Sequence, residues 1–414
     1  MSRRSPRRYF LALVGAAAVA SVTGPVVAAA QDAPRTILVR GERLAEAKRR
    51  IAAGDRDLQP ALDALVARAR AALAAPVLSV MQKQVVPPSG DKHDYMSLAP
   101  YWWPNPATRD GLPYVRRDGE FNPQSRTDHD GLRLQRTLML SKTLAYAWYF
   151  TGDAAFAEGA ARRLRVFFID PATRMHPNLK YGQAVLGVTE GRGAGMIDTR
   201  VLPDLVDTVR VLEGSTAWTS TDRDAMAAWC RAFLAWMFDS PQGREEGAAR
   251  NNHGVFYDAQ VAALALFVGD TARAREALDA RARARIAEQI GRDGGQPVEL
   301  ERTRPLHYSV FTLDAFTMLA EMARHVNADL WHFESPAGSS IARALRFVAP
   351  YAAAPDTFPR KDVTPFSPEV SLLPLRRAVA AIPEDVFVRT LAALPAAARE
   401  ADLSVFEFVA PAGR

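Results

Sequence analysis

The sequence predicts an all-α fold: an α/α toroid, which is an incomplete barrel of helical hairpins with long loops that shape a cleft. Apolar residues recur at intervals of three and four through most of the chain, and the alternation typical of strands is hard to find. Gly-Asp pairs separate consecutive helical segments, which indicates short hairpins. An open helical solenoid is the alternative, but the strict repeat that it would require is missing. Long irregular stretches favour the toroid.

The first thirty residues have the pattern of a removable signal peptide. Arginines precede an apolar run at 9–27, which ends in three alanines before Gln31. The dipeptide Arg7-Arg8 in this leader resembles a twin-arginine export signal. We therefore expect 31–414 to form one domain that is periplasmic or secreted, without stable membrane association once the signal is removed. A membrane anchor is the alternative interpretation.

Seven segments have helical periodicity: Leu132–Phe150, Ala154–Phe168, Val201–Leu212, Asp222–Phe238, Val255–Phe267, Thr271–Ile290 and Leu306–Val326. Gly152-Asp153 and Gly269-Asp270 each end one helix and begin the next. Glycine suits the left-handed position after a helix, and aspartate accepts hydrogen bonds from the free N–H groups of the following one. The irregular stretches at 81–130 and 170–198 are long enough to be functional loops. Six prolines in 350–382 predict a connector before a last helix at about 383–399.

Charge and cysteine content exclude several classes of protein. The formal net charge of +6 falls to +2 without the four arginines of residues 1–30, so it gives no evidence for a polyanionic partner. No basic stripe interleaved with aromatic residues supports nucleic-acid binding. Cys230 is the single cysteine, which leaves no internal disulfide, and its apolar surroundings predict a buried small residue rather than a nucleophile.

Two motifs supply the groups that β-elimination on a uronic-acid polymer requires. "RNNHGVFYD" at 250–258 places Asn252 beside His253, and "PVELERTRPLHYS" at 297–309 places Arg302 six residues before Tyr308. Removal of the C5 proton of a uronate requires neutralisation of its carboxylate, which amide and guanidinium donors can provide. A neutral histidine or an ionised tyrosine can take the proton, and a protonated tyrosine can return one to the departing oxygen. This chemistry needs no metal or other cofactor.

Tyrosine is a weak base at its ordinary pKa of about 10. Thr303 followed by Pro305 predicts a helix start, so Tyr308 would lie near the first turn, where the helix dipole favours negative charge. Arg302 would add a full positive charge. We therefore expect this environment to favour the phenolate for part of the reaction.

Further motifs carry a resemblance to a known family. They are "DYMSLAPYWWPNP" at 94–106, "GLPYVRRDGEFNP" at 111–123, "HPNLKYGQAVLGVTEGRG" at 176–193 and "DLW" at 329–331. Together with the two motifs above, this ordered set resembles the alginate lyase superfamily, whose members are α/α toroids that eliminate across uronate linkages without a metal. The arginine-to-tyrosine spacing is more similar to polysaccharide lyase family 38, which acts on alginate or glucuronan, than to family 5. The resemblance implies that Asn252 and Arg302 neutralise the carboxylate of an anionic polysaccharide, and that His253 and Tyr308 are base and acid.

Residues that surround these motifs are candidates for substrate binding. Trp102 and Trp103, bounded by prolines, are expected to provide one sugar-stacking ring and one hydrophobic plug. The other candidates, each with a structural role as the alternative, are Tyr95, Tyr181, Gln183, Arg192, Tyr257, Arg304 and His307. Asn251 is at least as well explained as a helix cap.

Three competing interpretations remain weaker. "TDHDG" at 127–131 could suggest a metal site, but adjacent residues rarely converge on one ion, so a capping and solvated loop is favoured. Glu299 and Glu301 could form the carboxylate pair of a glycoside hydrolase, although residues two apart near a helix start usually point in different directions. A glycan-binding protein without catalysis is the third interpretation. Which polymer is cleaved, and whether Tyr308 or His253 is the base, stay open.

Overall fold

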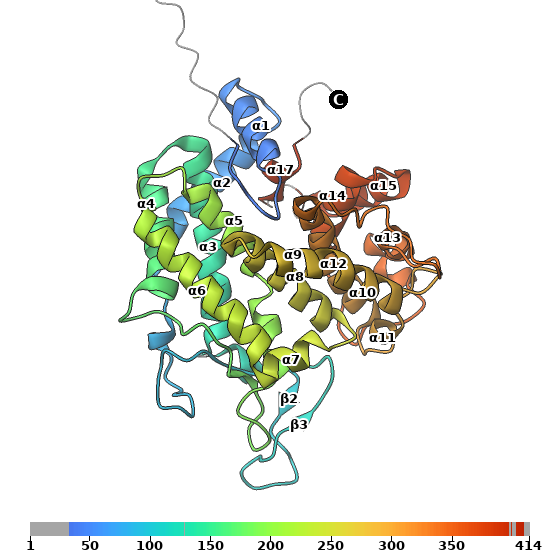
Figure 1. Cartoon of the computed structure of the whole chain (residues 1–414). Coiled ribbons are helices and arrows are strands. Elements are labelled where there is room, and N and C mark those ends of the chain that lie inside the picture. The colour runs from blue at the N-terminus through green and yellow to red at the C-terminus, as the bar shows by residue number, and fades with distance from the viewer. Residues whose placement is uncertain (1–32, 128, 397–398, 400–402, 410–414) are drawn as a thin grey trace, which may run out of the picture. The chain divides into compact units, whose positions relative to one another are not determined.

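Helices in two layers dominate the computed structural model, which describes residues 33–127, 129–396, 399 and 403–409 (Figure 1). The predicted signal peptide lies outside these residues. Each inner helix packs on the next along the chain, and the inner helices are α3 (Asp130–Thr151), α5 (Leu202–Leu212), α8 (Asn252–Val268) and α12 (Pro305–Met322). Outer helices pack on them, among them α2 (Gln59–Ala74), α4 (Ala154–Leu164), α6 (Ser220–Asp239), α10 (Ala282–Gln289) and α13 (Ile341–Ala352).

The sequence explains which helices are inner. Nearly every side chain of α8 and α12 is buried, and both helices are apolar on all faces, which is the composition of a helix enclosed by others. The outer helix α13 instead buries one face, with Ile341, Leu345 and Val348, and leaves Arg346 exposed. The ends of α8 and α12 therefore lie deep in the molecule, where they can hold functional groups away from water.

All seven helical segments predicted from periodicity are confirmed. Gly152 and Gly269 adopt φ values of 76° and 81° after α3 and α8, the left-handed conformation that glycine allows. Asp153 and Asp270 accept hydrogen bonds from backbone N–H groups of the next helix, as predicted. Two segments contain a π-helical turn, η3 (Arg165–Ile169) and η5 (Glu276–Arg281), and η5 divides the predicted segment 271–290 into α9 (Thr271–Arg275) and α10.

The prediction that 350–382 is only a connector before the last helix is wrong in part, because this segment contains a helix of its own. It contains η7 (Pro355–Thr357), η8 (Pro368–Ser371) and α14 (Leu372–Ala381). Pro368 and Pro374 lie in the first turns of η8 and α14, where the N–H group that proline lacks has no helical partner. Further helices have bounds α1 (Gly41–Ala52), α7 (Pro241–Gly247), α11 (Pro297–Leu300), α15 (Asp385–Ala393) and α17 (Ser404–Glu407). Short 3-10 turns are η1 (Val80–Gln82), η2 (Pro123–Arg126), η4 (Gly193–Thr199) and η6 (Ala323–Val326).

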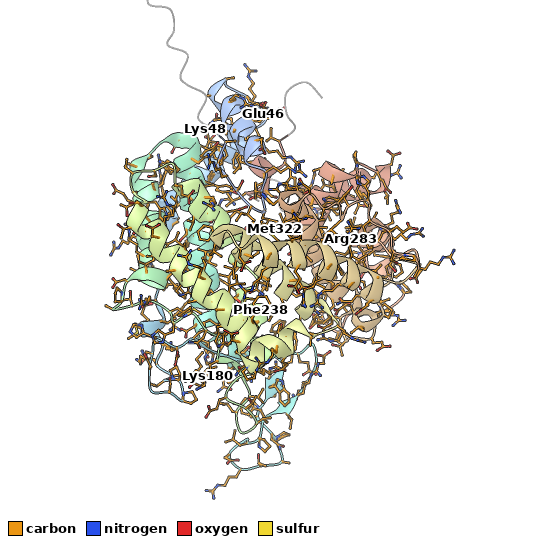
Figure 2. All side chains as sticks on the ribbon, viewed as in Figure 1. Glu46, Lys48, Lys180, Phe238, Arg283 and Met322 are labelled. Carbon is orange, nitrogen blue, oxygen red and sulfur yellow. The ribbon has the colours of Figure 1, made fainter. Side chains whose placement is uncertain are left out.

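The two long loops contain the strands and lie against each other. β1 (Met96–Leu98) of the first loop pairs in parallel with β4 (Tyr181–Ala184) of the second, and β2 (Trp102–Trp103) pairs in antiparallel with β3 (Val115–Arg116). In Figure 1 the β2–β3 ribbon lies at the opposite end from α1. In Figure 2, Lys180, just before β4, lies toward the end of the molecule that carries β2 and β3, and Glu46 and Lys48 of α1 lie at the opposite end.

Several local predictions can be checked in the core. Cys230 is buried in α6, as predicted, and burial raises the pKa of its thiol to about 12. The prediction of a solvated loop at 127–131 is wrong for Asp130, which begins α3, is fully buried and forms a 2.8 Å ion pair with Lys83. Within the described residues, no helix has the length and apolar character to cross a membrane.

Candidate active site

A cavity of about 700 Å³ lies where the two long loops meet the N-terminal ends of α8 and α12. All four predicted catalytic residues line it: Asn252, His253, Arg302 and Tyr308. The predicted binding residues Trp102, Gln183, Arg192, Arg304 and His307 line the same cavity. Segments more than 200 residues apart in sequence therefore contribute to one site.

His253 is oriented by a buried carboxylate. Its Nδ1 lies 2.6 Å from Oε1 of Glu246, a residue of α7 that is 3% exposed. An ionised carboxylate only accepts hydrogen bonds, so Nδ1 carries a proton, and in the neutral tautomer Nε2 is the nitrogen left to accept one. No hydrogen bond to Nε2 from the described residues occupies it. The arrangement suits a general base.

The motif around His253 is explained by close packing at the start of α8. Asn251 caps the helix by accepting a hydrogen bond from the His253 backbone N–H at 3.1 Å, the alternative considered for it from the sequence. A Cβ atom at Gly254 would lie 2.1 Å from the Ala249 carbonyl oxygen, so only glycine fits there. The tight chain path after α7 places Glu246 and His253 within contact.

Asn252 is held by a second buried carboxylate, that of Glu299. Both the backbone N–H and the side-chain amide of Asn252 donate to it, at 2.6 Å and at 3.0–3.1 Å. Glu299 is 2% exposed, and burial raises its pKa despite these hydrogen bonds. Glu301 is exposed, so the two glutamates do not form the pair that a glycoside hydrolase would use.

Tyr308 lies in the first turn of α12, as predicted, but its pKa shift is opposite to the one expected. The phenol donates a 2.6 Å hydrogen bond to the hydroxyl of Tyr101. Burial and then Tyr101 raise the pKa of Tyr308, and they outweigh Arg302, which lowers it. The Arg302 guanidinium carbon lies 3.9 Å from the centre of the Tyr308 ring. The phenol is therefore protonated in this state, which suits a general acid.

Arg302 already has a carboxylate partner in the protein. Its Nε and Nη2 atoms bind the two oxygens of Asp118 at 3.1 and 2.9 Å, the two-pronged geometry of a strong ion pair. Thr303 and Arg116 also donate to Asp118. Burial opposes ionisation of Asp118, but Arg302 and the Thr303 hydroxyl lower its pKa to about 2.

The predicted helix start at Thr303 is wrong by one residue. Arg304 is the N-cap of α12 and makes no capping hydrogen bond with its side chain. Asp362, distant in sequence, instead accepts hydrogen bonds from the backbone N–H groups of Leu306 and His307 at 3.0 and 3.2 Å. The Thr303 hydroxyl is directed to Asp118.

Gln183 and Arg192 form a hydrogen-bonded floor with Asp198. Arg192 donates to Oε1 of Gln183 at 2.8 Å, and Gln183 donates to Asp198 at 3.1 Å. Asp198 also accepts hydrogen bonds from Tyr95 and Ser97. Gln183 has a backbone φ of 47°, in the left-handed region, which is strained for a residue other than glycine. Burial lowers the pKa of Arg192, with a further contribution from Arg116.

Four predicted binding residues do not line the cavity. Tyr95 is fully buried and supports Asp198 from behind, and Tyr181 is buried in β4. Tyr257 packs between α8 and α6, where its hydroxyl donates to the Met237 carbonyl at 3.0 Å. Trp103 donates to the Glu120 carbonyl at 3.1 Å, so among the tryptophans of the "PYWWP" motif only Trp102 faces the cavity.

Sequence reasoning missed several residues of the site. Tyr101, Arg116 and Arg200 line the cavity. Asp118, Glu246 and Glu299 hold Arg302, His253 and Asn252, respectively. Tyr101 lies in the "PYWWP" motif, whose pattern points to its tryptophans as sugar-binding rings and not to the tyrosine. In the part of the chain that the structure describes, no cluster of three His, Cys, Asp or Glu side chains could hold a metal ion, and that includes 129–131.

Comparisons with known proteins show the family of this chain. The sequence pattern that defines the alginate lyase family matches residues 79–358. The structure of an alginate lyase from Bacteroides ovatus has 35% identity and a TM-score of 0.86, and the match covers 91% of this chain and 99% of that one. Alginate lyase A1-III from a Sphingomonas species has 17% identity and a TM-score of 0.48, with 79% and 90% covered. A variant of A1-III complexed with tetrasaccharide has 14% identity and a TM-score of 0.54, with 92% and 99% covered, which bears on the fold alone. The search of curated proteins gives no match.

The α/α-toroid fold predicted from the sequence is confirmed, and the family match identifies a polysaccharide lyase. The family match covers more than half of the chain and the similarity to the Bacteroides ovatus structure spans almost all of it. The chain belongs to the alginate lyase family.

Proposed function

We propose that this chain cleaves 1,4-linked uronic-acid polymers, alginate or a similar chain, by β-elimination that requires no metal. The observation that carries the proposal is that His253 and Tyr308, each positioned by a partner, line one arginine-rich cavity. Six arginines line it: Arg116, Arg126, Arg192, Arg200, Arg302 and Arg304. Asp198 is the only carboxylate among the described lining residues, and its oxygens are already hydrogen-bonded. Such a cavity favours a polyanion.

The residues divide the reaction into proton removal and leaving-group protonation. A base takes the C5 proton, and the C–H electrons move onto the carboxylate to form an enolate-like dianion that cationic donors stabilise. The dianion then collapses, forms the C4–C5 double bond and breaks the C4–O4 bond, while Tyr308 protonates the departing O4. The products are a new reducing-side hydroxyl and a 4,5-unsaturated uronate end.

The stereochemistry of the linkage selects the base. In guluronate the C5 proton and O4 lie on opposite faces of the ring, so His253 takes the proton and Tyr308 donates to O4. In mannuronate and glucuronate they lie on the same face, so Tyr308 can serve both steps if its proton is first lost, with Arg302 above the ring to stabilise the phenolate. The hydrogen bond between Nδ1 of His253 and Glu246, together with the raised pKa of Tyr308, supports the guluronate reaction, in which His253 is the base and Tyr308 the acid.

Product absorbance tests this proposal. Purified protein is incubated with polymannuronate, polyguluronate, glucuronan and a glycosaminoglycan, and the conjugated product is followed in the ultraviolet. We expect absorbance with at least one polyuronate and its loss in Tyr308→Phe. New reducing ends without absorbance would indicate a hydrolase, and binding without either signal would indicate a glycan-binding protein.

The same panel identifies the base. We expect His253→Gln to lose activity on polyguluronate, where the proposed mechanism assigns proton removal to the imidazole. If this variant cleaves polyguluronate at the wild-type rate, His253 is not the base. Export through the N-terminal signal is part of the proposal and is tested by the N-terminal sequence of the mature protein.

A further inference from the structure

Arg200 and Arg304 line the cavity and have no carboxylate partner among the described residues, unlike Arg302. Arg304, the N-cap of α12, is 8% exposed, and its Nε atom has no hydrogen bond in the described structure. Arg200, just before α5, donates to the Ile197 carbonyl at 3.1 Å and lies over the Phe311 ring. Neither forms an ion pair with a described residue, whereas Arg302 binds both oxygens of Asp118.

His307 lines the cavity with these arginines and contacts Phe311, the ring over which Arg200 lies. Its ring is stacked on Phe311 at 6.1 Å with an interplanar angle of 9°, and its Nδ1 atom is buried without a hydrogen bond in the described structure. Burial and then the charges of Arg304, Arg200 and Arg302 lower the pKa of His307 to about 4. The imidazole is therefore neutral near pH 7 and can donate or accept a hydrogen bond.

Asp362 does not neutralise this cluster. Asp362 feels the charge of Arg304, but its two oxygens accept the backbone N–H groups of Leu306 and His307. A cation that is largely removed from water without a partner is unfavourable, and an anion that binds beside it relieves that penalty. The cluster therefore presents positive charge to the cavity without a protein carboxylate to balance it, and an anionic ligand could supply the balancing charge.

We propose that Arg200, Arg304 and His307 form a subsite for the carboxylate of the uronate that adjoins the cleaved residue. This inference rests on the proposed function. The centre of the His307 ring lies 5.4 Å from that of Tyr308, so the subsite is beside the reacting sugar and not at a remote surface. It is separate from the group around Asn252 and His253, which belongs to α8. Every residue of a polyuronate carries a carboxylate, so a neighbouring sugar always presents one.

The subsite has a distinct kinetic signature. An interaction made equally in the ground state and the transition state changes KM and leaves kcat almost unchanged. We expect Arg200→Gln and Arg304→Gln each to raise KM for a tetrasaccharide of the cleaved polyuronate about tenfold, the usual effect of one charged hydrogen bond. We also expect a weaker dependence of KM on salt, because one charge fewer contacts the substrate.

A matched control separates local charge from net charge. Arg117→Gln removes the same charge from a residue whose guanidinium lies over Trp103, outside the cavity, and should leave KM unchanged. The thermal midpoint of each variant shows whether it folds. Binding of the tetrasaccharide is also measured by calorimetry in the Tyr308→Phe background, where no turnover occurs.

The outcomes distinguish this inference from the proposed function. Cleavage by the wild type with higher KM and weaker calorimetric binding in both arginine variants supports the subsite. Cleavage with unchanged KM in those variants, or with a loss confined to kcat, overturns the subsite and leaves the proposed function intact. No cleavage, but tetrasaccharide binding that both substitutions weaken, supports the subsite and overturns the proposed function. Neither cleavage nor binding overturns both.

Discussion

His253 and Tyr308 face one cavity, but different kinds of partner hold them. On the α8 side, His253 and Asn252 are fixed by Glu246 and Glu299, which are 3% and 2% exposed. On the α12 side, Arg302 and Tyr308 are fixed by Asp118 and Tyr101, which belong to the first long loop (81–130) and remain partly exposed. We call these the α8 wall and the α12 wall.

The difference shows which catalytic side chains are oriented by the helices and which are oriented by the loop. The carboxylates of the α8 wall are part of the helical body, so the orientation of His253 does not require the loop. The α12 wall is complete only when the loop places Asp118 against Arg302 and Tyr101 against Tyr308. Loops are less rigid than the elements that they connect. Loss of a partner should therefore be more costly on the α8 wall.

The largest effect is expected for Glu246→Gln on the α8 wall. Glutamine is similar in shape but lacks the charge that holds the Nδ1 proton, and its amide can bind the opposite tautomer of His253. We expect kcat to fall about 100-fold on polyguluronate, which is within the usual contribution of a general base. Steady-state kinetics from ultraviolet absorbance measures this.

A polymer cleaved through Tyr308 alone provides the internal control for Glu246→Gln. Activity on polymannuronate should fall far less, because His253 is not its base. An equal loss on both polymers, with an unchanged thermal midpoint, would show that Glu246 acts on something other than the base.

The supporting carboxylates were not predictable because they reach the site through tertiary contacts. The helices could be predicted, since apolar periodicity and Gly-Asp caps are local, and so could His253 and Tyr308, which lie in short motifs. Asp118 and Arg302 are 184 residues apart, and Glu299 is 47 residues from Asn252. Nothing near Glu246 in sequence distinguishes it from the exposed Glu245 in the same helix. The phenol's raised pKa also required its burial to be known.

A smaller effect is expected for Asp118→Asn on the α12 wall. Asparagine keeps one acceptor for Arg302 but loses the charge, so the guanidinium is held less firmly over Tyr308. We expect kcat to fall about tenfold, because hydrogen bonds to charged groups are the stronger kind. Glu120→Gln is the matched control, since it removes a negative charge from an exposed residue of the same loop.

Acid titration tests the same ion pair. The pKa of Asp118 is lowered to about 2, so the pair is fully present above the ordinary value near 4 and is lost as the pH falls through about 2. The ratio of wild-type to Asp118→Asn rates should therefore stay constant from neutral pH down to about 4. A ratio that already declines between pH 7 and 5 would contradict the assigned ion pair.

The smallest effect is expected for Tyr101→Phe, which removes one neutral hydrogen bond from the α12 wall and no charge. Tyr308 then loses the acceptor of its proton at 2.6 Å, and kcat should fall about threefold, the usual worth of such a bond. After burial, Tyr101 makes the next largest contribution to the raised pKa of Tyr308, so removal of its hydroxyl should move the alkaline limb of the rate profile to lower pH. A pH profile measures both changes. An alkaline limb that stays in place would mean that Tyr101 does not change the pKa of Tyr308. The properties of Tyr308 would then depend on the helices alone, as those of His253 do on the α8 wall.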